Sequence, residues 1–121
     1  MDSQDDAAAV SACQLFGDLI PNLAERAEIF RVDVDVLDEE IHGIYANQIR
    51  DLVNSLTAAC REHNTEIVRK HAHSLEGTGG TMGFPEISIV GWELSAAAKK
   101  PDWDRCAAIA ERLKRWSLSL G

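Results

Sequence analysis

The chain has 121 residues, 45% of them hydrophobic, which is typical of one soluble globular domain with a sizeable core. Twenty acidic and twelve basic residues give a formal charge of -8, which disfavours binding to nucleic acids and to anionic membranes. The N-terminus lacks the positive start of a signal peptide, and no apolar run approaches the length of a membrane span. We therefore expect a cytoplasmic protein that binds neither nucleic acid nor membrane.

The first third of the chain predicts short helices. Apolar residues at helical spacing predict a helix over residues 5–19, and Pro21 either ends that helix or opens another. A second short helix is predicted through about Glu28. The only strand-like alternation, Phe30 to Val36, is too short and isolated to build a sheet. We assign residues 1–32 to an N-terminal helical extension packed on or beside the remaining domain.

The next predicted helix is long, from Asp35 to about His63. Asp35 can cap it, and acidic residues fill its first turn, where negative charge suits the helix dipole. Its predicted buried stripe consists of Leu37, Ile41, Ile44, Gln48, Leu52, Leu56 and Ala59.

Three further amphipathic helices follow, joined by short turns. They begin near Asn64, Pro85 and Asp102, and the last ends near Leu118. Short connections imply antiparallel neighbours, so residues 33–121 predict an all-α, up-and-down four-helix bundle. Trp103 and Trp116 fall on the predicted core side, whereas Trp92 lies off its stripe and is a candidate for a surface contact.

Residues 68–83 combine an apolar stripe, two histidines and several glycines. On a helical wheel the stripe lies within roughly 40° of one line, and His73 points about 140° away from it. His73 is therefore predicted to face solvent beside Arg69 and Lys70, while His71 lies at the edge of the core. The stripe consists of Val68, Ala72, Leu75, Gly79 and Met82.

The glycines divide into two groups on the same wheel. Gly79 points toward the core, where it can let a neighbouring helix approach closely. Gly77 and Gly80 are predicted to face outward, where each costs the helix about 1 kcal/mol relative to alanine. Their missing side chains would leave room around the imidazole of His73.

No other chemistry has a recognisable pattern. His71 and His73 point about 200° apart on a helix and cannot bind one metal ion. The three cysteines, Cys13, Cys60 and Cys106, form no metal or disulfide pattern and are expected to be buried thiols. The glycine run lacks the ending of a P-loop, and no serine or cysteine has a histidine partner at a catalytic spacing. We predict no metal site.

An exposed imidazole that is partly neutral near pH 7 can accept a phosphoryl group and release it again. The run Ala72-His73-Ser74-Leu75-Glu76-Gly77, followed by Met82-Gly83, resembles the signature of histidine-containing phosphotransfer (HPt) domains. The resemblance extends loosely from about Val34 to Leu118. One position departs from it, because the family usually has lysine where this chain has Glu76.

The resemblance implies a four-helix bundle that carries a phosphoryl group on His73 between aspartates of response-regulator receiver domains. It also implies a hybrid histidine kinase as a partner and no cofactor of the chain's own, since the receivers bring Mg²⁺ and catalysis. The expected docking face is His73 with Arg69, Lys70, Glu76, Gly77 and Gly80. We expect a carrier and not an enzyme, as a monomer or weak dimer.

Two alternatives remain open. The chain could be a docking module of the same fold that binds receivers or kinases without carrying phosphate, which Glu76 makes conceivable. It could also be an unrelated helical oligomerisation module that uses the N-terminal helix and the tryptophans.

Overall fold

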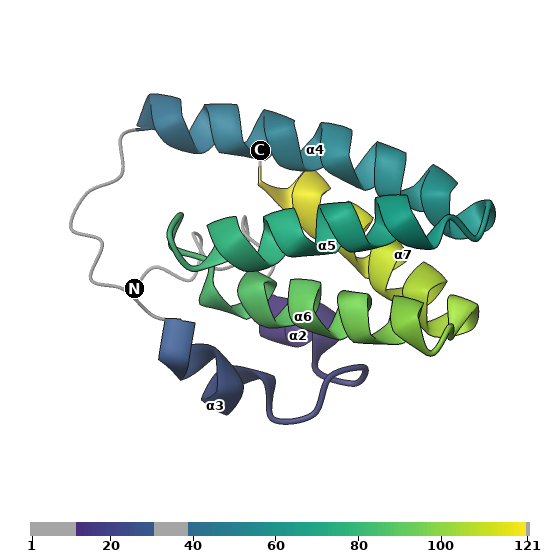
Figure 1. Cartoon of the computed structure of the whole chain (residues 1–121). Helices are drawn as coiled ribbons and strands as arrows, with labels where there is room; N and C mark the ends of the chain where they lie inside the picture. The colour runs from purple at the N-terminus through teal and green to yellow at the C-terminus, as the bar shows by residue number, and fades with distance from the viewer. Residues whose placement is uncertain (1–11, 31–38, 121) are drawn as a thin grey trace.

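The structure is a computed structural model, which describes residues 12–30 and 39–120. Over these two ranges all regular structure is helical, so the predicted all-α class is confirmed. In this described part of the chain four long helices follow three short ones, and Figure 1 shows their arrangement. The helices are α2 (Ala12–Phe16), α3 (Leu23–Ala27), the 3-10 helix η1 (Glu28–Phe30), α4 (Glu39–Arg61), α5 (Thr65–Gly79), α6 (Pro85–Lys99) and α7 (Trp103–Ser119).

The ends of the long helices follow from local sequence. The Asn64 side chain caps α5 by accepting a hydrogen bond from the Ile67 amide at 3.2 Å. Asp102 caps α7 in the same way through the Arg105 amide at 3.1 Å. Pro85 occupies the first turn of α6, where it needs no amide donor, and Gly83 precedes it with φ of 90°.

The four long helices form the predicted bundle. α5 packs between α4 and α6, and α7 packs against the same two helices from behind in the view of Figure 1. The connections at 62–64, 80–84 and 100–102 are too short for anything but antiparallel neighbours.

The buried face of α4 differs from the predicted stripe. Leu56 and Ala59 are buried as predicted, but Ile41 and Ile44 are 45% and 52% exposed, and Gln48 is exposed as well. The buried residues are Tyr45, Ala46, Ile49, Val53, Leu56, Ala59 and Cys60. Two apolar stripes on α4 have the same helical spacing, so their periodicity could not tell which one meets the other helices.

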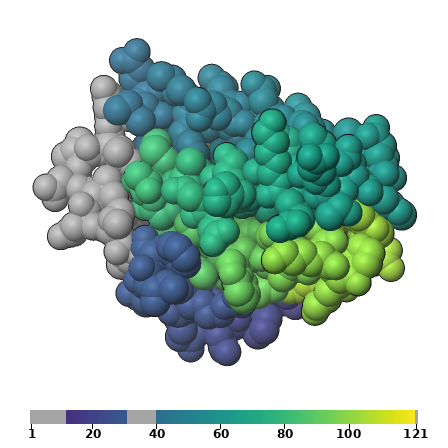
Figure 2. All heavy atoms as spheres, viewed as in Figure 1, coloured from purple at the N-terminus to yellow at the C-terminus, as the bar shows by residue number. Residues whose placement is uncertain are grey.

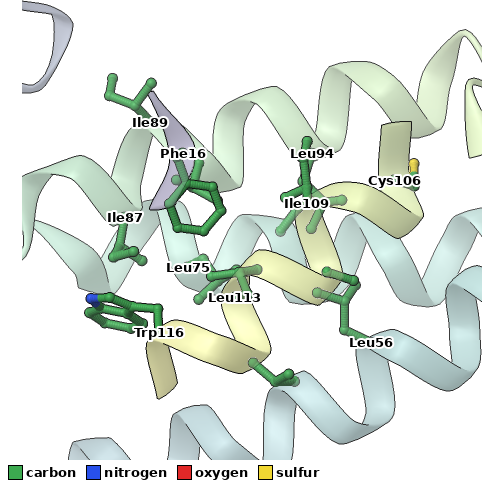
Figure 3. Close-up of a cluster of buried hydrophobic side chains, with 14 of the residues drawn as sticks. Phe16, Leu56, Leu75, Ile87, Ile89, Leu94, Cys106, Ile109, Leu113 and Trp116 are labelled. Atoms are coloured by element: carbon green, nitrogen blue, oxygen red, sulfur yellow. The ribbon is translucent and has the colours of Figure 1, made fainter. Parts of the chain in front are cut away.

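The short N-terminal helices cover the outer side of α6 and α7. α2 packs on both of these helices, and α3 packs on α6. Phe16 of α2 is fully buried and points into the same apolar cluster as Leu75 and Leu113 (Figure 3). Ile20 is also fully buried. Residues 12–30 therefore close one side of the core.

Two ion-pair groups fix this N-terminal segment. Arg112 of α7 binds both carboxylate oxygens of Asp18, at 2.7 and 3.0 Å, and also donates to the backbone oxygen of Leu15. Glu93 of α6 binds Arg26 of α3 at 2.8 Å and Arg105 of α7 at 3.0 Å. One carboxylate thus connects three helices.

Some predictions fall outside the described residues. These are the first part of the helix over 5–19, the Asp35 cap, the alternating segment after Phe30, and Leu37 of the predicted buried stripe. Where the helices are described, none is long and apolar enough to cross a membrane.

The tryptophans and cysteines lie largely as predicted. Trp116 is buried and Trp92 is 52% exposed, whereas Trp103 is half-buried and stacks on the His63 ring at 4.7 Å between centroids. Cys60 and Cys106 are buried free thiols, whereas Cys13, which was also expected to be buried, is half-buried. A hydrogen bond with Cys60, together with burial, raises the pKa of the Cys106 thiol.

Candidate functional site

The two histidines of α5 point in different directions. Val68, Ala72, Leu75 and Gly79 are buried on the core side of the helix, and His73 is exposed on another side. Figure 2, viewed as in Figure 1, shows the surface of α5 open to solvent between α4 and α6. The prediction of an exposed His73 is confirmed.

His71 lies at the edge of the core, as predicted. It is half-buried, and its Nε2 atom lies 2.9 Å from the Ser55 hydroxyl of α4. Burial, and to a smaller extent the neighbouring Lys70, lowers the pKa of His71. Its ring is thus held in a structural contact on the α4 side. Within residues 12–30 and 39–120, no group of three histidine, cysteine or acidic side chains could hold a metal ion.

The glycines near His73 have three different roles. A Cβ atom on Gly77 would meet nothing within 4 Å, so this position is open as predicted. A Cβ atom on Gly79 would lie 2.7 Å from the Ser88 amide nitrogen, so Gly79 lets α6 approach closely. The outward placement predicted for Gly80 is wrong, because Gly80 is buried and a Cβ there would lie 2.6 Å from the Phe30 oxygen.

That correction has a simple physical cause. The N-terminal segment folds back against the end of α5, and η1 covers Gly80. A helical wheel shows only which side of one helix a residue occupies. It cannot show that a segment fifty residues earlier in the chain packs on that side.

A hollow of about 410 Å³ opens beside His73. Ile29 and Phe30 of η1 form one wall, and His73, Glu76 and Gly77 of α5 form another. Figure 2 shows residues 23–30 reaching the same face of the molecule as α5 and α6. Ile29 and Phe30 were not predicted to belong to the site, since no local pattern distinguishes them from core residues of a short helix.

The charged residues predicted for the site divide between two places. Glu76 is half-buried and lines the hollow. Arg69 and Lys70 are exposed on α5, one turn before His73, and are not among the residues that line it. The structure thus brings Glu76, Gly77 and Gly80 into one hollow with His73, and leaves the two cations on the surface preceding it.

Ser88 of α6 is a further residue of the site that the sequence analysis missed. Its hydroxyl donates a hydrogen bond to the Glu76 backbone oxygen at 2.8 Å and accepts one from the Gly80 amide at 2.9 Å. In a regular helix the Gly80 amide would bond directly to that oxygen. Ser88 replaces this bond and fixes the end of α5, about two turns after His73.

The Hpt domain family model matches residues 18–117 of the chain. The chain belongs to the Hpt domain family. This Hpt domain begins, by the match, inside the N-terminal segment that was assigned to residues 1–32. No curated protein and no solved structure matches the chain.

Membership defines the general function of the chain. Hpt domains are phosphotransfer modules of phosphorelays, which carry a phosphoryl group and interact with receiver domains and histidine kinases. In this Hpt domain His73 is exposed, a hollow lies beside it, and the open Gly77 follows one turn later.

Proposed function

We propose that His73 of this Hpt domain accepts a phosphoryl group from an aspartyl phosphate of one receiver domain and returns it to another. The observation that carries the proposal is the position of His73: its ring is exposed, it borders a hollow, and it lies one turn before the open Gly77. His71, the other histidine of α5, is engaged with Ser55 instead.

The transfer would proceed by nucleophilic attack. A neutral ring nitrogen of His73 attacks the phosphorus atom, an N–P bond forms, and the P–O bond to the aspartate breaks. The aspartate leaves as a carboxylate, and the second ring nitrogen of His73 keeps its proton. The reverse reaction onto another aspartate regenerates the neutral imidazole.

The surrounding residues would assist in different ways. Arg69 and Lys70 would attract the anionic phosphoryl group. Each would stabilise it by about 1 kcal/mol or less, because both side chains are exposed. Gly77 would leave room for the partner's active site over the ring. The receiver would bring the Mg²⁺ ion and the catalytic groups, so we propose no cofactor bound by this chain, with receivers and a hybrid histidine kinase as partners.

A transfer assay tests the proposal. The protein is incubated with a receiver domain that has been phosphorylated with labelled acetyl phosphate, in the presence of Mg²⁺. We expect label on the chain that is labile to acid and stable to alkali, as phosphohistidine is. His73→Gln should abolish it, and His71→Gln, the matched control on the same helix, should retain it.

Two outcomes would contradict the proposal. Label that persists in His73→Gln would show that another residue carries the phosphoryl group. Binding of the receiver without any transfer, by the native protein, would instead favour the docking module as the function.

A further inference from the structure

A second hollow adjoins the one beside His73. Its volume is about 500 Å³, and Arg26, Ile29, Phe30, Glu76, Ile89 and Trp92 line it. Ile29, Phe30 and Glu76 line both hollows, so the two hollows lie side by side. We call this surface, defined by Ile29, Phe30, Glu76, Ile89 and Trp92, the docking groove.

The docking groove exposes apolar surface that the fold does not use. Ile29 is 81% exposed and Trp92 is 52% exposed. Both are large apolar side chains beside a polar site, and such patches on a monomer commonly mark contact surfaces. Aromatic residues such as Trp92 are also over-represented among the residues that dominate binding energy.

The charges in the docking groove are unequally compensated. The Arg26 guanidinium lies 5.3 Å from the centre of the Trp92 ring and forms an ion pair with Glu93 at 2.8 Å. Glu76, in contrast, has no ion pair or side-chain hydrogen bond with any residue that the structure describes. A half-buried carboxylate is thus left between two apolar hollows without a cation of its own.

From this arrangement we infer that the docking groove selects receiver domains that place a basic side chain against Glu76 and an apolar side chain against Trp92 and Ile29. The inference rests on the proposed function, because it takes a receiver domain as the occupant. The shared lining supports that choice, because a partner that docks over His73 would also cover Glu76 and Ile29, which line the same hollow. A nucleic acid or an anionic membrane would be repelled by Glu76 and by the net charge.

The inferred role of Glu76 is specificity. Docking removes water from the Glu76 carboxylate. A basic residue on the receiver replaces that water with an ion pair, whereas an acidic or apolar residue at the same place leaves the carboxylate unpaired. Glu76 therefore affects how well a receiver docks, and not the bond-making step at His73. Its substitutions should change KM more than the rate at saturation.

Receiver kinetics provide the test. With the receiver that transfers phosphate to the native protein fastest, we expect Glu76→Lys to raise KM about tenfold and Glu76→Gln about threefold, with the saturating rate within about twofold. The matched control is Glu62→Lys, which makes the same charge change at an exposed residue of the loop between α4 and α5, eleven residues before His73. It should leave KM within about twofold.

Charge reversal on the receiver identifies the partner residue. Each exposed lysine and arginine near the acceptor aspartate of that receiver is changed to glutamate and assayed against native protein and Glu76→Lys. At least one such receiver variant should have a raised KM with native protein, and with Glu76→Lys its KM should return close to the value for the native pair. If no variant does so, the ion pair does not exist and the inference fails.

The apolar half of the docking groove is tested separately. Trp92→Ala should raise KM about tenfold, and Leu118→Ala, which changes an exposed apolar residue on α7, should not change it. Equal kinetics for Glu76→Lys, Trp92→Ala and native protein would overturn the inference while leaving phosphorylation of His73 intact. Loss of all label in the native protein would instead contradict the proposed function.

Discussion

Ser88 shows how one residue can shape the site from a neighbouring helix. It is fully buried, and its hydroxyl lies between the Glu76 carbonyl and the Gly80 amide. This contact allows α5 to end beneath η1 while its backbone groups remain hydrogen-bonded. The geometry of the turn after His73 therefore depends on a side chain of α6.

Replacing Ser88 tests this role. We expect Ser88→Ala to lower the free energy of unfolding by about 1–3 kcal/mol, because the Gly80 amide and the Glu76 carbonyl would both lose their buried partner. Urea unfolding followed by circular dichroism measures the change. Ser95→Ala, a half-buried serine on the same helix, is the control. An unchanged value for Ser88→Ala would mean that α5 closes its own hydrogen bond when the hydroxyl is absent.

His71 makes the stability of the folded protein depend on pH. Its pKa is lowered, so the folded protein binds the proton less well than the unfolded chain, whose histidine pKa is about 6.5. Protonation of His71 therefore favours unfolding. The stabilising effect of the neutral ring is fully present above about pH 6.5 and is lost as the pH falls through the pKa of His71 in the folded protein.

Titration of the ring by NMR checks the direction of this shift. In the native protein the His71 resonance should titrate below about pH 6.5. The difference in urea midpoint between pH 7.5 and pH 5.5 should be larger for the native protein than for His71→Gln. A His71 pKa above 6.5 would contradict the assignment of the ring to the core edge.

At the scale of elements, the crossing of α5 and α6 determines where His73 lies. Each helix contributes a glycine to the contact. A Cβ atom on Gly91 of α6 would lie 2.6 Å from the Ala72 oxygen and 2.7 Å from the Glu76 amide nitrogen, and Gly79 makes the equivalent approach from α5. The two helices are in such close contact that neither position has space for a methyl group.

Gly91→Ala should therefore destabilise the protein although alanine is the better helix former. The helix would gain about 1 kcal/mol, but a methyl group forced against backbone atoms costs about 1–3 kcal/mol and moves the helices apart. We expect a net loss of stability by urea unfolding and a slower transfer to His73. A more stable Gly91→Ala protein would show that the crossing can relax without cost.

Gly77→Ala is expected to separate stability from transfer. Nothing lies within 4 Å of a Cβ at Gly77, so alanine should stabilise the helix by about 0.5–1 kcal/mol. If a partner docks over His73, the added methyl group should nevertheless slow phosphotransfer. Gly43→Ala on α4, which is equally open, is the matched control and should stabilise without slowing transfer. Equal transfer rates for the two variants would exclude a docking role for Gly77.

At the scale of the whole molecule, the N-terminal segment is held to the bundle by charge as well as by burial. Glu93 binds Arg26 and Arg105, and so connects α3, α6 and α7. Burial acts to raise the pKa of Glu93, but the hydrogen bonds from Arg105 and Arg26 outweigh it and lower the pKa overall. These contacts hold the N-terminal segment against α6 and α7, and Ile29 and Phe30 of this segment line the hollow beside His73.

Glu93→Gln should lower the free energy of unfolding by about 1–2 kcal/mol at pH 7, less than for a fully buried pair because the arginines are partly exposed. Because the folded pKa is lowered, this advantage of the native protein exists above about pH 4.3 and is lost as the pH falls through the folded pKa. Urea unfolding at pH 7 and pH 3 measures it. Glu111→Gln, which removes an exposed pair with Arg115, should have no measurable effect.

Local sequence was sufficient to predict the class of fold and the exposure of His73. Caps, prolines and glycines placed the starts of α5, α6 and α7 within about two residues. The apolar spacing of α5 separated His71 from His73, because the apolar residues of this helix follow its 3.6-residue repeat on one side only. The signature around His73 then indicated the family.

Contacts between distant residues required the tertiary structure. The buried face of α4, the covered Gly80, the Ser88 hydrogen bonds and the docking groove all depend on which helix lies beside which. A repeat within one helix carries no information about the segment that packs on it. The N-terminal η1 and the distant α6 therefore complete a candidate site, whereas the exposure of its histidine could be predicted from α5 alone.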